Sequence, residues 1–162
     1  MFDTIMGLPA HVLLVHAAVV FLPLLALAAT VFAMFPSLRS RIDWAVALLC
    51  LAGPTSALAA KLSGAELEKD LVAKGYGQEI LAQVHIHRQY GDMSLWFSLG
   101  LAAATFLFLL LTRRARRGRP RGFRAFIMLV LNIGVVVLAA VTAYYVYRTG
   151  DSGATAVWSG VA

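Results

Sequence analysis

The chain has 162 residues, of which 60% are apolar and 14% charged, whereas a typical soluble domain is roughly 45–50% apolar and about 25% charged. This composition excludes a water-soluble globular protein and favours one membrane domain over residues 1–162. The net charge of +6 could indicate nucleic-acid binding. The basic residues are nevertheless sorted as membrane topology requires, so we expect no nucleic-acid partner.

Four apolar runs are long enough to cross a lipid bilayer, which takes a helix of about 20 residues. The first contains no Asp, Glu, Lys or Arg, follows no Lys or Arg and is longer than the apolar part of a secretory signal, so we expect it to be a retained anchor. The predicted fold is therefore all-α, a polytopic bundle of four transmembrane helices. The predicted spans are residues 12–35, 44–60, 93–112 and 123–147.

The segment between the second and third runs is polar. Ser63 followed by Glu66 is typical of a capping box that opens a short helix, and Gly75 with Gly77 is expected to end that helix. We therefore predict a short amphipathic segment on the outer face. A helical stretch over residues 78–90 then either lies at the surface or continues into the third span.

The two ends of the chain carry turn signals. Pro9 suits the first turn of a helix, because its missing N–H would be unpaired there in any case. The Gly-rich segment 149–158 is typical of a folded turn rather than of a helix.

The charges predict the orientation, because short cytoplasmic loops of membrane proteins collect Lys and Arg. Nine basic residues and one acidic residue lie after the first run or around the Arg-rich loop 113–122, against five basic and seven acidic residues on the other side. We therefore predict a multi-pass protein of the cell membrane. Its Arg-rich loop would lie in the cytoplasm and both termini on the extracytoplasmic side.

Four histidines fall on or near the predicted outer side, although they come from distant segments: His11, His16, His85 and His87. An ionisable side chain inside a membrane usually marks a functional or polar-paired position. Neither sequence pair shares one helical face, so ligation would have to join different helices. If the helix continues into the third span, His87 lies on a face of small residues with Ser94. We therefore expect His16 and His87 to form an inner pair, and His11 and His85 an outer pair.

Two imidazoles from different helices can be the axial ligands of a b-type haem, whose propionates Arg88 and Arg148 could contact. Cys50 is the only cysteine, which excludes covalent attachment of a haem through two cysteines. The same histidines with Asp151 could instead bind or transport Zn²⁺ or Cu²⁺, and methionines on this side could bind Cu(I). The histidines could also transfer protons, or the protein could be a non-catalytic accessory subunit without a cofactor. We expect no independent enzymatic activity.

Residues 7–16, the pair His85 and His87, and residues 150–154 resemble a family of small bacterial four-span proteins, domain of unknown function 2231. The family usually has proline directly after the first histidine, where this chain has Val12. The resemblance implies the four-span fold. Because similar members occur fused or adjacent to Rieske-type domains, it also implies redox work with a partner such as an iron–sulfur protein.

Overall fold

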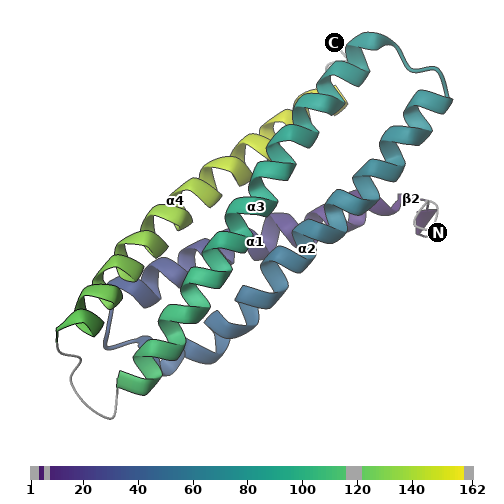
Figure 1. Cartoon of the computed structure of the whole chain (residues 1–162). Coiled ribbons are helices and arrows are strands. Elements are labelled where there is room, and N and C mark those ends of the chain that lie inside the picture. Colours follow the sequence, from purple (N-terminus) through teal and green to yellow (C-terminus); the bar gives the residue numbers. More distant parts are fainter. Residues whose placement is uncertain (1–3, 6–7, 116–121, 159–162) are drawn as a thin grey trace.

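The computed structural model is a bundle of four long helices (Figure 1). It describes residues 4–5, 8–115 and 122–158. Two strands of two residues each pair antiparallel ahead of the first helix. The predicted all-α fold of four helices is confirmed. The elements are β1 (Thr4–Ile5), β2 (Leu8–Pro9), α1 (Ala10–Met34), α2 (Arg39–Ala73), α3 (Gln78–Ala115) and α4 (Phe123–Trp158).

The helices surround a common axis. Helix α1 packs against α2 and α4, and α3 packs against the same two helices, so that α1 and α3 face each other across a diagonal. The start of α1, the α2–α3 connection and the end of α4 lie at one end of the bundle (Figure 1). This end contains His11 and His87 and is called the histidine end below.

All four helices are long and apolar enough to cross a membrane. Large apolar side chains cover the outside of the bundle, for example Phe126, which is 60% exposed. Lipid accepts such a surface, and a helix satisfies its own backbone hydrogen bonds there. The expectation of an integral protein in contact with the bilayer is confirmed.

The predicted polar segment between the second and third spans is present, but it is formed by the ends of α2 and α3. Helix α2 runs without interruption through Ser63, which is buried and donates its hydroxyl hydrogen bond to the Ala60 carbonyl at 3.0 Å. The predicted helix start at Ser63 is therefore wrong, because this hydroxyl is satisfied one turn back within the same helix. Gly75 does end the helical segment, with a φ of 74°. Residues 78–90 continue directly into the third span.

The structure differs from both expectations for the chain ends, the position of Pro9 and the turn over residues 149–158. Residues 149–158 belong to α4, which continues to Trp158, so the predicted turn is wrong. Pro9 lies in β2 rather than in the first helical turn, and α1 begins at the next residue, Ala10. Glycine and serine in segment 149–158 permit a helix, and the packing of α4 against α3 supports it.

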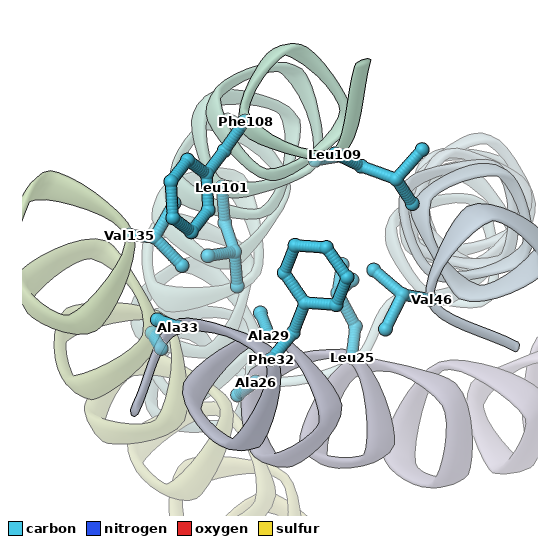
Figure 2. Packing of buried hydrophobic residues seen from close by; sticks show 12 residues of the cluster. Leu25, Ala26, Ala29, Phe32, Ala33, Val46, Leu101, Phe108, Leu109 and Val135 are labelled. Atoms are coloured by element: carbon cyan, nitrogen blue, oxygen red, sulfur yellow. The ribbon is translucent and has the colours of Figure 1, made fainter. Parts of the chain in front are cut away.

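The larger of the two apolar clusters among the described residues lies in the half of the bundle away from the histidine end, and the smaller one, around Leu22 and Leu95, lies nearer to it. Phe32 of α1 and Phe108 of α3 meet edge to face with ring centroids 5.8 Å apart, and both are fully buried (Figure 2). Leu109 and Val46 pack beside them in the same cluster. This cluster fills the interior between all four helices.

The last turn of α1 is capped by side chains from two other helices. Arg39 of α2 donates hydrogen bonds to the carbonyls of Phe32 and Ala33, both at 2.8 Å. Asn132 of α4 donates to the Ala33 carbonyl at 2.8 Å. These bonds satisfy carbonyls that a helix end leaves without a partner.

Candidate functional site

The first half of the candidate site joins α1 to α2. His11 lies in the first turn of α1, and its Nδ1 lies 3.0 Å from the Ala60 carbonyl and 3.2 Å from the Ser63 hydroxyl. A carbonyl oxygen only accepts hydrogen bonds, so Nδ1 carries the proton of this ring.

The second half joins α3 to α4 with the same geometry. Nδ1 of His87 lies 3.0 Å from the Thr149 carbonyl and 3.3 Å from the Ser152 hydroxyl. Ser152 in turn donates to the Thr149 carbonyl at 3.0 Å, as Ser63 does to the Ala60 carbonyl. The two half-sites therefore have equivalent hydrogen bonds.

A glycine of the facing helix lies directly against each imidazole ring. A Cβ atom at Gly64 would lie 3.0 Å from Cε1 of His11, and a Cβ atom at Gly153 would lie 2.9 Å from Cε1 of His87. Both distances are shorter than ordinary van der Waals contact. Glycine at these two positions therefore lets each ring approach the backbone of the facing helix.

The two imidazoles meet across the bundle. Their ring centroids lie 6.2 Å apart and their planes cross at 80°. Within the described part of the chain, Nε2 of neither ring has a hydrogen-bond partner. Two unprotonated Nε2 atoms are thus available as ligands at the centre of the histidine end.

The other two histidines lie elsewhere. His16 is exposed and hydrogen-bonds through Nδ1 to the Val12 carbonyl of its own helix. His85 is also exposed, with its Nδ1 3.4 Å from the side-chain amide of Gln89. The expected pairing of His16 with His87 is therefore wrong, and the observed pair is His11 with His87. A separation of five residues turns a helix by about 140°, so an inward His11 places His16 outward.

The remaining predicted site residues bond other side chains or are exposed. Arg88 is bound to Glu68 at 2.8 Å, and Asp151 is exposed. Arg148 donates to the Tyr90 hydroxyl at 2.7 Å. No group of three or more His, Cys, Asp or Glu side chains suited to a metal ion occurs among the described residues.

A family model described as "Predicted membrane protein (DUF2231)" matches residues 7–162. The chain belongs to this family. No curated protein and no solved structure matches the chain. Membership in the DUF2231 family agrees with the four apolar helices and confirms the predicted family.

Local sequence signals do not reveal the groups that hold the imidazoles in this DUF2231 protein. They assign Ser63 to a helix start, and Ser152 and Gly153 to a turn. A usable signal is the Ser-Gly dipeptide, which follows the second apolar run at residues 63–64 and the fourth at residues 152–153 and again at 159–160. The dipeptides 63–64 and 152–153 each face the histidine of the preceding helix in their own helix pair.

Proposed function

We propose that this protein is a redox-associated membrane protein that holds a b-type haem between His11 and His87. The observation that carries the proposal is the 6.2 Å separation of the two ring centroids. Imidazoles this close together, one from α1 and one from α3, could both bind a single metal atom placed between them.

The donor set supports a haem more than a zinc ion. The site offers two imidazoles, and a structural zinc site takes four ligands, usually from the protein. A porphyrin supplies four nitrogens itself and needs only two axial ligands, for which imidazole is a common choice. When bound, the haem would supply one-electron transfer.

The surrounding residues support ligation through Nε2. The Ala60 and Thr149 carbonyls accept the Nδ1 protons, which fixes the tautomer and leaves the Nε2 lone pair free. Gly64 and Gly153 leave room for the rings. These four residues therefore orient the ligands without taking part in the chemistry.

The apolar core supports a bound cofactor more than a transport path. Phe32, Phe108 and Leu109 close the interior below the histidine end. A transported metal ion would need polar partners along the whole bundle. We therefore propose that the site exchanges electrons on the histidine side. Its partner would be a soluble redox protein such as an iron–sulfur protein. By the charge rule this side is extracytoplasmic in the cell membrane.

The test is a spectrum of detergent-purified protein, oxidised and dithionite-reduced, after expression with sufficient haem. We expect a Soret band and sharp reduced bands. His11→Ala and His87→Ala should lose them, whereas His16→Ala and His85→Ala, the matched controls, should keep them. A colourless protein, or a spectrum unchanged in both His11→Ala and His87→Ala, contradicts the proposal.

Copper is the second candidate, because two imidazoles at 6.2 Å also suit a two-coordinate ion, and imidazole is a good copper ligand. Metal analysis of the same sample separates the two. Stoichiometric copper in a colourless protein, lost in His11→Ala, would favour copper binding. A colourless, metal-free protein would favour an accessory subunit in which the imidazoles only hydrogen-bond.

A further inference from the structure

Most basic side chains at the histidine end have a carboxylate partner, and Arg148 differs from them. Its guanidinium hydrogen-bonds to the neutral hydroxyl of Tyr90, and no carboxylate lies within ion-pair distance of it among the described residues. The paired side chains are Lys61 with Asp92 at 2.9 Å, Lys69 with Glu66 at 2.8 Å and Arg88 with Glu68 at 2.8 Å.

Tyr90 holds the guanidinium of Arg148 in place, and Asp151 acts on it as a nearby negative charge without forming an ion pair. The guanidinium lies over the Tyr90 ring, with Cζ 4.9 Å from the centroid, and Nη2 donates to the hydroxyl at 2.7 Å. Its Nε is buried without an acceptor within the described chain. A charged donor group without an acceptor is costly, and guanidinium has five N–H groups suited to phosphate or carboxylate oxygens. Among the described residues, Nη2 bonds only a neutral hydroxyl, so the accessible part of this partly buried side chain can bind an anionic oxygen from outside the chain.

The surroundings of Arg148 place this anion at the depth of lipid headgroups. Tyr144 and Tyr147 lie within about one turn on the same helix and are 54% and 68% exposed. Tyrosines gather at the membrane–water interface because one part of the ring is apolar and the hydroxyl is polar. The phosphates of the lipid lie at this level.

The two half-sites differ at this position. Arg148 directly precedes Thr149, whereas Ala59 directly precedes Ala60, whose carbonyl is the equivalent acceptor for His11. The extra charge belongs to the α3–α4 pair alone. It is therefore not needed for holding an imidazole, which α2 does without it.

We propose that Arg148 and Tyr90 form a binding site for the phosphate of an anionic phospholipid at the α3–α4 seam on the histidine side. The site is independent of the proposed haem. The same oxygen chemistry could come from a haem propionate, so the experiment has one arm for each source.

The lipid arm uses the whole protein, reconstituted into nanodiscs of phosphatidylcholine with phosphatidylglycerol and released into mild detergent. Native mass spectrometry then counts the lipids retained. We expect preferential retention of phosphatidylglycerol, reduced about tenfold in Arg148→Leu, because a charge-assisted hydrogen bond is lost. Arg88→Leu, whose arginine is already paired with Glu68, is the control and should retain the lipid.

Arg148→Lys keeps the positive charge and should therefore retain part of the bound phosphatidylglycerol. Comparing it with Arg148→Leu separates the effect of losing the charge from an effect of misfolding. Each variant is compared after size-exclusion chromatography. Equal retention of both lipids by the wild type, or undiminished phosphatidylglycerol on folded Arg148→Leu, overturns the proposal.

The second arm compares the binding of haem and of haem dimethyl ester to the apoprotein. If the ester binds as tightly as haem, the propionates are not the anion, which supports the lipid site. If Arg148→Leu weakens haem but not the ester, the anion is a propionate and the lipid site is overturned. If neither compound binds, the proposed haem function fails, and the lipid arm still decides the role of Arg148.

Discussion

Gly153 of α4 lies so close to the imidazole of His87 that an added Cβ atom would stand 2.9 Å from Cε1 of the ring. Gly64 of α2 has the same relation to His11, at 3.0 Å. Each imidazole can therefore occupy its position only because the residue that faces it is a glycine without a side chain. Because each ring also bonds that helix through Nδ1, it cannot move away without breaking the bond.

Gly64→Ala and Gly153→Ala should each displace the facing imidazole by a few tenths of an ångström and destabilise the bundle by about 1–3 kcal/mol, the usual range for overpacking. If the haem proposal holds, both variants should also retain several-fold less haem per protein. Gly134→Ala is the matched control, since nothing lies within 4 Å of its added Cβ. Haem content and the thermal unfolding midpoint in detergent are the measurements. Equal behaviour of all three variants would show that the glycines do not position the rings.

Arg39→Ala should lower the free energy of unfolding by about 1–3 kcal/mol, because two carbonyls at the end of α1 lose a charged donor. The guanidinium also covers the Phe108 ring, with Cζ 4.9 Å from the centroid, so packing is lost as well. Arg41→Ala removes the same charge from an exposed position and should have little effect. Thermal unfolding in one detergent compares the two variants. A similar shift for both would point to net charge rather than to capping.

Phe32→Ala should be among the most destabilising single changes, costing up to about 3–5 kcal/mol. The ring is fully buried against Phe108, and its removal leaves a cavity that four long helices cannot readily close. Phe126→Ala removes the same side chain from a position that is 60% exposed and faces outward, where lipid can fill the space. The unfolding midpoints decide, and a loss for Phe126→Ala as large as for Phe32→Ala would contradict this assignment of the core.

The predicted orientation can be tested with single cysteines in a Cys50→Ala background. Lys74 lies in the α2–α3 connection at the histidine end, and Arg114 lies near the end of α3 at the opposite end of the bundle. In intact cells an impermeant maleimide should label Lys74→Cys at once. Arg114→Cys should react only after the membrane is permeabilised. The reverse pattern would place the histidine end in the cytoplasm.

The four spans were predictable because a bilayer requires about 20 apolar residues in a helix, and the chain has four such runs between polar segments. Asn132, a polar side chain inside an apolar run, bonds the Ala33 carbonyl of another helix, as such side chains commonly do in membrane bundles. The extent of α2 and α4 was not predictable from local signals. Ser63 and the Gly-rich segment 149–158 have the composition of a cap and a turn, and their place inside helices depends on contacts such as the Ser63 bond to Ala60 and the packing of α4 against α3.

The amino-acid sequence by itself determined the fold class, the number of spans and the presence of histidines near one end of the bundle. Only the tertiary structure decided which histidines meet. In a membrane helix both the lipid-facing and the buried sides are apolar, so hydrophobic periodicity does not reveal which side faces the interior. The rotation of α1 and α3 about their axes is decided by close packing and by hydrogen bonds such as those of His11 to α2 and His87 to α4. That rotation places His11 rather than His16 opposite His87.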